Sequence, residues 1–408
     1  MPNTSGEGKK KRGQFDWFLL FIVIFLLGFG LVMIYSSSSY SASLNNDGDG
    51  LFYFKKQAVS IAVGLFVMLI AACVSYKLYD RFALLIFLVA VVMIPIVKTK
   101  FGVEVNGATR WIRIYGLTVQ PSEFAKLAVI IITAATVAGM SDRALASWKG
   151  IVISFVFAAI LSLMVLFLTE NLSSAIIIAG IAFFMYLLAA PANYRPWLLL
   201  ALVVAAAVFL VLLITEGWGV KIFGADRWGE LMGFRGERIL AWRDPEKYAD
   251  GKGFQTLQSL YGIGSGGVFG KGLGKSMQKL GFLPEAQNDM IFSIICEELG
   301  LFGGLAILLM FFMLLFRIWR ISFYCKDRFG LLLLIGVFSH IAIQVIINIA
   351  VVTNLFPNTG ITLPFISYGG SSVIFLMAEI GIVLNISSRL EFGGGKKNAK
   401  EGKTEGKA

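Results

Sequence analysis

Residues 251–300 read GKGFQTLQSLYGIGSGGVFGKGLGKSMQKLGFLPEAQNDMIFSIICEELG. The stretch holds nine glycines between Gly251 and Gly274, and its one aspartate, Asp289, stands at the edge of the next apolar run. The stretch also holds Lys271, Lys275 and Lys279. A flexible, cationic loop rich in free backbone groups suits a large anionic substrate that is held by its phosphates. We therefore predict that this loop carries the function and that the rest of the chain supports it.

The composition is that of an integral membrane protein. Of the 408 residues, 57% are hydrophobic and 15% are charged, whereas a soluble domain carries about 25% charged residues. The net charge of +11 would suit nucleic acid, but much of the excess lies in the tails and short loops, where membrane topology explains it. We expect no nucleic-acid partner. The three cysteines show no disulfide or metal-ligand spacing.

The apolar runs predict ten membrane spans, all of them helical because lipid cannot satisfy exposed backbone groups. They lie at about 17–35, 58–75, 82–97, 123–138, 150–168, 173–190, 197–215, 290–316, 329–352 and 371–387. The predicted fold is an all-α integral membrane protein, a bundle of ten transmembrane helices with a large extracytoplasmic loop, 216–290, between helices 7 and 8. Residues 17–390 form this membrane domain. A basic cytoplasmic tail, 1–16, precedes it, and a disordered cytoplasmic tail rich in Gly and Lys, 391–408, follows it.

Charge sets the expected orientation. An even number of spans places both termini on one side, and with that side cytoplasmic the inner segments hold most lysines and arginines of the tails and short loops. The first run is too long for a cleaved signal peptide, so we expect it to stay as a span. The short outer loop 98–122 breaks the charge pattern with four basic residues: Lys98, Lys100, Arg110 and Arg113. An anionic lipid headgroup at the outer surface would account for them.

Several residues of the segment 106–127, NGATRWIRIYGLTVQPSEFAKL, are candidates for a site. Trp111 suits the membrane interface beside Arg110, and the alternative is an interfacial amphipathic turn with no further role. Glu123 and Lys126 are ionisable groups at the entry to a span, which makes them functional candidates. Being three residues apart, they can also neutralise each other.

Two further outer segments stand out. Residues 169–174, TENLSS, form a tight polar hairpin that is either functional or a plain connector. Residues 353–370 are dense in Pro, Gly, Thr and Ser, and they include Ser367. Such a segment is either a link between spans or a re-entrant segment that offers backbone amides to a ligand, since irregular backbone at membrane depth is tolerated only where protein or water lines it.

Several short patterns in the chain are rejected as motifs. The glycines at 262, 264 and 267 match a dinucleotide-binding pattern but lack a strand and helix around them, and Gly274-Lys275-Ser276 lacks the first glycine of a P-loop. His340, the only histidine, has no metal partners in its span, so we interpret it as a packing or hydrogen-bonding residue.

Asp289 carries the strongest functional hypothesis. The alternative is an ordinary helix N-cap, because Asn288 and Asp289 directly precede an apolar run and N-caps favour these residue types. The flanking sequence Phe282-Leu283-Pro284 and the following span would instead desolvate the carboxylate, which raises its pKa toward neutral pH and makes it a useful base. Glu297 and Glu298, deeper in the same run, are buried ionisable residues that rarely occur without a purpose.

These residues together resemble a known family. The stretches NGATRWI, QPSEFAKL, GFQTLQSLYGIGSGGVFGKGLG, LPEAQNDMIFSIICEELG and NTGITLPFISYGGSS are similar, in order and across about 17–390, to the SEDS family of cell-wall polymerases, and most similar to its division-type members. The resemblance implies a bacterial plasma-membrane peptidoglycan glycosyltransferase that polymerises lipid II on the outer face. It implies a class B penicillin-binding transpeptidase as partner within the division or elongation machinery, and a division septum as location.

The resemblance also implies residue roles. Asp289 matches the essential catalytic carboxylate, while Arg110, Trp111, Glu123 and Lys126 match residues of the substrate site. A divalent cation, magnesium or manganese, is implied as a helper, and Asp289 is the one candidate ligand.

Two positions depart from the family pattern. Asn171 stands where the family commonly has an aspartate, which puts any role of that position in doubt. Lys56-Gln57 replaces the usual Arg-Gln, and lysine keeps the charge but loses the bidentate fork. We still expect Lys56, Gln57 and Ser367 to contact substrate.

The mechanism that we expect needs a base and a set of cations. Asp289 would take the proton from the acceptor hydroxyl, and Arg110, Lys126 and Lys275 or a metal would stabilise the departing pyrophosphate. The alternative is a lipid II flippase without chemistry, its path lined by the buried glutamates and Lys126. A scaffold that only recruits the transpeptidase would leave the glycine loop and Asp289 unexplained.

Overall fold

The computed structural model describes residues 15–45, 48–105, 108–114, 117–195, 197–199 and 234–390. The predicted tail 391–408, residues 1–14 of the other tail and nearly all of the predicted seventh span, 197–215, lie outside these ranges. The first part of the predicted loop 216–290 does so as well.

The described chain is mostly helical, which confirms the predicted class. Eight helices are long and apolar enough to cross a membrane. They are α1 (Trp17–Asn45), α2 (Phe52–Cys73), α5 (Pro121–Ala138), α7 (Trp148–Leu168), α8 (Leu172–Ala189), α14 (Ile291–Tyr324), α15 (Arg328–Val352) and α16 (Gly370–Ser387). The apolar helix α4 (Ala83–Ile96) is shorter but coincides with the predicted third span. Short helices complete the described set: α3 (Lys77–Arg81), α6 (Asp142–Leu145), α12 (Phe234–Arg243) and α13 (Lys252–Gly266).

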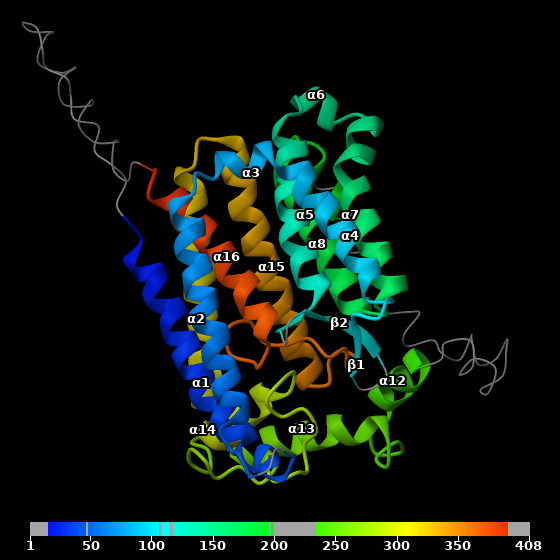
Figure 1. Cartoon of the computed structure of the whole chain (residues 1–408), viewed down its shortest axis with the longest axis vertical. Coiled ribbons are helices and arrows are strands. Elements are labelled where there is room, and N and C mark those ends of the chain that lie inside the picture. Colours follow the sequence, from blue (N-terminus) through cyan, green and yellow to red (C-terminus); the bar gives the residue numbers. More distant parts are fainter. Residues whose placement is uncertain are drawn as a thin grey trace, which may run out of the picture.

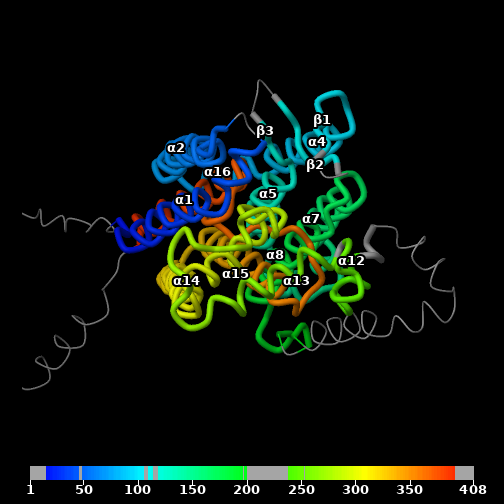
Figure 2. The backbone as a smooth tube through the Cα atoms, turned by 90° about the horizontal axis from the view of Figure 1, so that it is seen from below, coloured from blue at the N-terminus to red at the C-terminus, as the bar shows by residue number. Residues whose placement is uncertain are grey.

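The long helices lie side by side and leave two distinct ends (Figure 1). One end carries α3 and α6. The other, which we call the sheet end, carries three strands together with α12 and α13. Viewed from below, α13 and the segment that precedes α16 extend across the sheet end (Figure 2). The predicted outer loops therefore gather at one end of the bundle.

A three-stranded antiparallel sheet joins α4 to α5. It consists of β1 (Gly102–Val105), β2 (Ala108–Ile114) and β3 (Leu117–Val119) in the order β1-β2-β3. Val103 pairs with Trp111, and Arg113 pairs with Thr118. The strands are rich in β-branched residues, which favour this conformation. The predicted all-α fold contained no strands in this outer loop, so the sheet is an addition to it.

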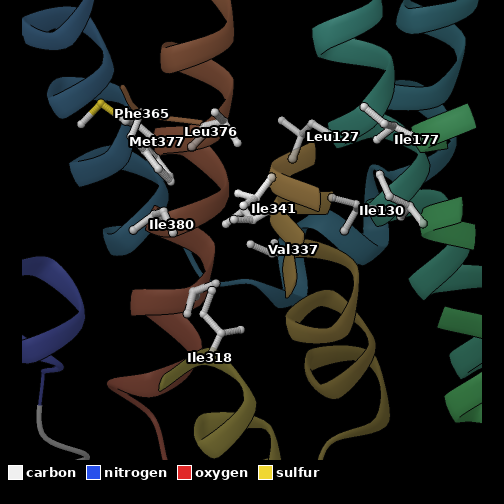
Figure 3. Close-up of a cluster of buried hydrophobic side chains, with 14 of the residues drawn as sticks. Leu127, Ile130, Ile177, Ile318, Val337, Ile341, Phe365, Leu376, Met377 and Ile380 are labelled. Atoms are coloured by element: carbon white, nitrogen blue, oxygen red, sulfur yellow. The ribbon is translucent and has the colours of Figure 1, made fainter. Parts of the chain in front are cut away.

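The centre of the bundle is formed by α5, α15 and α16. Their buried side chains interlock in one apolar core, which Figure 3 shows for residues from all three helices: Leu127, Ile130, Val337, Ile341, Leu376, Met377 and Ile380. In contrast, only 22% of the most apolar 18-residue stretch of α7 is buried. A helix with apolar residues all round and little burial faces lipid in a membrane protein.

The segment between α15 and α16, residues 353–369, re-enters the bundle. Leu363, Phe365 and Ile366 are buried, and Figure 3 places Phe365 beside Met377. A Cβ at Gly30 would lie 2.8 Å from the Cα of Ile366, and Gly30 stands in the middle of α1. The irregular backbone therefore reaches membrane depth, as the re-entrant interpretation of the sequence expected.

The glycine-rich stretch is less flexible than predicted. Residues 252–266 form the helix α13, so the prediction of an irregular loop holds only for the residues after it. These residues hydrogen-bond to a break in α14, where Gly300 has a φ of 69°. The N–H groups of Lys271 and Gly272 donate to the carbonyls of Glu297 and Glu298. We call residues 267–282 the lysine loop.

Gly270 and Gly300 allow this close approach. Both have positive φ, and a Cβ would lie 2.2 Å from the Glu298 carbonyl at Gly270 and 2.4 Å from the Gly270 nitrogen at Gly300. We expect Gly270→Ala and Gly300→Ala each to lower the free energy of unfolding by more than the roughly 1–2 kcal/mol of left-handed strain alone. Thermal unfolding in detergent measures this. Gly264→Ala is the matched control, because nothing lies within 4 Å of its Cβ position; equal stability of all three variants would contradict the close approach.

A buried carboxylate and its surroundings at the sheet end

Asp289 lies just before α14 and is 7% exposed. The helix begins at Ile291 after Met290, and no side chain caps its first turn, so the N-cap interpretation is wrong. Leu283, Ala286 and Met290 are buried around the carboxylate position in the sequence. Of the three flanking residues predicted to desolvate the carboxylate, Leu283 is buried, whereas Phe282 and Pro284 are exposed. The carboxylate is therefore enclosed, but not by all of the predicted residues.

Burial raises the pKa of Asp289 to about 7, and the negative charge of Glu285 adds to this effect. Backbone hydrogen bonds and the positive charge of Arg238 act in the opposite direction. A carboxyl group with a pKa near 7 exchanges its proton readily at neutral pH, which is the property required of a general base. The predicted rise in pKa is thus confirmed, with its predicted cause.

Arg238 provides positive charge that acts on this carboxylate, and Arg110 acts on Arg238 in turn. Arg238 of α12 donates from Nη1 to the Asn358 carbonyl at 3.0 Å, and Arg110 of β2 donates from Nη2 to the Glu170 carbonyl at 3.0 Å. Burial lowers the pKa of Arg238, Arg110 lowers it further by repulsion, and Asp289 opposes both. Arg238 therefore interacts with both Asp289 and Arg110. Sequence analysis selected Arg110 but missed Arg238, which no pattern distinguishes from the other basic residues of the long loop.

Amide side chains orient the carboxylate. Gln255 of α13 donates from Nε2 to Oδ1 of Asp289 at 3.4 Å and to the Pro284 carbonyl at 3.2 Å. Asn358 in turn donates to Oε1 of Gln255 at 2.7 Å. The other carboxylate oxygen faces Gly360, where a Cβ would come within 3.9 Å of it. Gln255 and Asn358 were not predicted, because polar residues are common in loops and nothing in the sequence marks these two.

Side chains from several elements hold the re-entrant segment by its carbonyl groups. The donors are Trp242 to Asn354, Arg238 to Asn358, Ser173 to Thr359, Asn348 to Ile361, Gln344 to Thr362 and Gln57 to Ser367. They come from α2, α8, α12 and α15. Side chains thus replace the backbone partners that an irregular segment at membrane depth lacks.

Gln57 and Ser367 act within this segment. Gln57 is fully buried and also accepts from the Gly369 N–H at 3.1 Å, while the Ser367 hydroxyl accepts from the Leu363 N–H at 2.8 Å. Lys56 is exposed, with its ammonium 4.0 Å from the centre of the Phe52 ring. The structure gives these three residues clear local roles, and their contact with substrate stays a prediction.

The hairpin between α7 and α8 is more than a connector. Asn171 caps α8, its Oδ1 accepting from the Ser174 N–H at 3.0 Å. Ser173 bonds the re-entrant segment, and Glu170, at a φ of 52°, provides the carbonyl that Arg110 contacts. Asparagine serves as a cap as well as aspartate does, so the departure from the family pattern at position 171 preserves the local fold.

Glu123 and Lys126 of α5 form a buried ion pair, with 2.8 Å between Oε1 and Nζ. Lys126 also donates to Oε1 of Gln344 at 3.1 Å, and its exposed fraction is 1%. Among the described contacts, neither side chain touches Asp289. Trp111 follows Arg110 in β2 and therefore points to the opposite face of the sheet. Direct roles of these three residues toward substrate stay predictions.

The lysine loop is anchored by two ion pairs. Lys271 lies 2.7 Å from Glu297, and Lys279 lies 3.0 Å from Glu298, which also accepts from Ser36 of α1. The buried glutamates that the sequence marked as unusual therefore serve this anchoring. Lys275, between the two anchored lysines, is exposed, and among the described contacts it forms no ion pair.

Comparison with known proteins identifies the family of the chain. The family described as cell cycle proteins, named for FtsW, RodA and SpoVE, matches residues 17–391. The chain belongs to the FtsW/RodA/SpoVE family. The match covers the whole described bundle together with its sheet end.

Named relatives of this family are similar along nearly their full length. A probable peptidoglycan glycosyltransferase FtsW of Trichlorobacter lovleyi is 37% identical over 93% of this chain and 95% of its own. The stage V sporulation protein E of Bacillus subtilis is 37% identical over 92% of this chain and 98% of its own. The FtsW relative and the sporulation relative are thus equally similar to this chain.

Solved structures of the FtsW/RodA/SpoVE family share the fold. A chain of a peptidoglycan synthase complex, described for its coordination of polymerization and crosslinking, matches with a TM-score of 0.68 at 26% identity, over 91% of this chain and 97% of that one. The rod shape determining protein RodA of Thermus thermophilus matches with a TM-score of 0.62 at 24% identity, over 92% and 98%. The second likeness shows the fold alone.

The two loop lysines differ in a way that can be tested. Lys279→Met leaves the buried Glu298 carboxylate without its ammonium partner, and breaking a buried pair in this way costs about 3–5 kcal/mol. We expect a correspondingly lower free energy of unfolding, measured in detergent. Lys275→Met, four residues away, removes an exposed charge and is expected to leave stability unchanged. A stable Lys279→Met variant would show that the anchoring pair is dispensable.

Proposed function

We propose that this chain is a peptidoglycan glycosyltransferase that polymerises lipid II into β-1,4 glycan strands, with Asp289 as the general base. Family membership and the names of its relatives support the reaction class. The observation that carries the residue assignment is the position of Asp289, a buried carboxylate with a pKa of about 7 on which Arg238 acts, while Arg110 acts on Arg238 in turn. This combination provides both a proton acceptor and cations for an anionic leaving group.

The proposed step is a displacement at the donor sugar. Asp289 takes the proton from the acceptor 4-hydroxyl while the oxygen forms a bond to C1 of the donor, and the bond from C1 to the pyrophosphate oxygen breaks with inversion. The polyprenyl pyrophosphate leaves as an anion, so it needs no protonating acid of the glycosidase kind. Arg110 and Arg238, with Lys275 further along the lysine loop, stabilise the charge that develops on it.

The proposal sets the orientation in the membrane. The sheet end faces the outside of the bacterial plasma membrane, because lipid II polymerisation takes place there, and both termini are cytoplasmic. The charge distribution of the tails and short loops supports this direction. The probable FtsW relatives support a place at the division septum.

We assign a crosslinking enzyme as the partner, in the form of a class B penicillin-binding transpeptidase. The support is the fold shared with a chain of a synthase complex that coordinates polymerization with crosslinking. Glycan strands and their crosslinks are made from the same substrate, so a physical complex would deliver each new strand directly to the second enzyme.

A divalent cation stays an expectation for this site. No three His, Cys, Asp or Glu side chains gather in metal-binding geometry among the described residues. Magnesium-type sites commonly use one or two carboxylates together with substrate phosphates, and Asp289 with the lipid pyrophosphate would fit that pattern. The cation would supply further positive charge at the departing phosphates.

Replacing Asp289 tests its role as the base. Asp289→Ala and Asp289→Asn are expected to lose about 10²–10⁴-fold in rate, because both remove the proton acceptor. The assay uses purified protein, its transpeptidase partner, a divalent cation and lipid II, and it follows glycan chains on gels. Asp80→Ala is the control, since Asp80 is an exposed carboxylate of α3 at the opposite end. Glycan synthesis by Asp289→Ala at the normal rate would rule out the proposed role.

The same assay separates the enzyme from a flippase. Lipid II supplied directly in detergent needs no transport, so glycan chains form only if the protein performs the chemistry. The buried charges that suggested a transport path are paired with one another in the structure, as Glu123 is with Lys126, which weakens the transporter alternative.

The polymerisation rate is expected to depend on pH. A base must be deprotonated, so with a folded pKa of about 7 the rate is expected to rise as pH increases through 7 and to fall below it. Glu285 raises the pKa of Asp289 by its charge. Glu285→Gln is therefore expected to shift the acid limb of the pH–rate profile to lower pH. This shift is expected to be smaller than the whole rise in the pKa of Asp289, because burial is the larger cause of that rise. An unchanged limb in Glu285→Gln would contradict the assignment of that limb to Asp289.

A further inference from the structure

One face of α15 carries three buried polar side chains. His340, Gln344 and Asn348 follow one another at intervals of four residues, which places them in a row along the helix. Their exposed fractions are 1%, 1% and 0%. Most polar groups buried so completely are hydrogen-bonded. Each side chain of this row has partners, although Oδ1 of Asn348 has none among the described contacts, and the partners show what the row does. We call it the α15 row.

Asn348 connects the two chain segments that surround the catalytic carboxylate. Its Nδ2 donates to the backbone carbonyl of Asp289 at 2.8 Å and to the carbonyl of Ile361 at 2.7 Å. One amide group thus joins the start of α14 to the re-entrant segment, next to Gly360, which faces the carboxylate.

Gln344 holds the next residue of the same segment. Its Nε2 donates to the Thr362 carbonyl at 3.0 Å, which fixes the orientation of the amide. Its Oε1 then accepts from Lys126 at 3.1 Å and lies 2.9 Å from Nε2 of His340. The Gln344 side chain therefore links the re-entrant segment to Lys126 and His340 in the centre of the bundle.

Buried charges complete the row at its far end. Nδ1 of His340 lies 2.8 Å from the carboxylate of Glu379 on α16, and Lys126 is paired with Glu123 on α5. Nε2 of His340 donates to Oε1 of Gln344, which is an acceptor. The contact of Nδ1 with the Glu379 carboxylate then needs one proton, on either the nitrogen or the oxygen. Removing one member of such a buried set leaves an uncompensated charge or dipole in low dielectric, so the set holds α5, α15 and α16 in one arrangement.

We propose that Asn348 is a positioning residue for Asp289, and that the α15 row fixes the catalytic carboxylate relative to the re-entrant segment. The proposal rests on the function assigned to Asp289. Neither Asn348 nor Gln344 needs to touch substrate for this role, because each acts on backbone carbonyls. Glu123 and Lys126 belong to the same support through Gln344.

The expected size of the effect follows from the geometry. Without Asn348 the start of α14 and the residues at 360–362 lose their direct link. A misplacement of about 1 Å at a reacting centre can cost about 100-fold in rate. Arg110 is held by the Glu170 carbonyl and Lys275 lies on the lysine loop, both outside the loosened segment, so we expect binding of lipid II to change little.

The test compares two buried asparagines that each bridge backbone groups. Asn348→Leu removes the link beside Asp289. Asn385→Leu removes a similar link at the opposite end of the bundle, where the equally buried Asn385 donates to the Ala72 carbonyl and accepts from the Tyr76 N–H. Both variants lose buried hydrogen bonds, but only the first is expected to affect the position of the base.

For Asn348→Leu, we expect kcat for lipid II polymerisation to fall about 100-fold with KM unchanged, and Asn385→Leu to keep its kcat per folded molecule. Hydrogen exchange provides a readout independent of activity. Exchange is expected to increase in peptides covering 286–292 and 357–363 for Asn348→Leu only. Unchanged kcat and unchanged exchange in those peptides would overturn the proposal.

Asn348→Ser is the milder second variant, with the same expectations. If both Asn348 variants fail to fold while Asn385→Leu folds, the residue is structural and the positioning role is wrong. Asp289→Ala is measured in parallel. Normal activity of Asp289→Ala would refute the proposed function itself, whereas loss of activity in Asp289→Ala together with normal Asn348→Leu would refute the positioning role alone.

Discussion

The structure depends on one constraint, which is that irregular backbone at membrane depth must find its hydrogen-bond partners within the protein. The re-entrant segment meets this constraint through side chains. Trp242, Ser173 and Gln57 each donate to one of its carbonyls, and the α15 row donates to two. Elements far apart in the sequence are thereby held in fixed positions around one short stretch of chain, and the site lies where they meet.

The same enclosure raises the pKa of Asp289. The packing that satisfies the re-entrant segment also excludes water from the carboxylate, and exclusion of water raises the pKa of that group to about 7. Arg238 connects the two effects, because its guanidinium donates to the segment at Asn358 and its charge opposes the rise. Stability of the fold and basicity of the site therefore share one cause.

Much of this organisation could be predicted from the sequence. Length and apolarity predicted the long helices, and the apolar flanks of Asp289 predicted its raised pKa. The spacing of Glu123 and Lys126 allowed their pairing. These features depend on neighbours close in the sequence, where patterns carry the information.

Other features could not be predicted because they depend on distant partners. Asn348 lies 59 residues from Asp289 and Arg238 lies 120 residues from Asn358, and no local pattern marks either contact. The ion pairs of Lys271 and Lys279 arise because α14 breaks at Gly300 and admits the lysine loop. The sheet was missed because its strands are short and lie between two apolar runs.

The two anchoring pairs have a consequence for how an anionic lipid reaches the site. Three lysines in the loop suggest strong attraction, yet Glu297 and Glu298 neutralise two of them at about contact distance. The loop then presents little more than a single positive charge to its surroundings, and a lone exposed charge is screened within about 10 Å at ordinary salt. Delivery of substrate would be governed by two-dimensional diffusion in the leaflet, and its rate would respond only weakly to ionic strength.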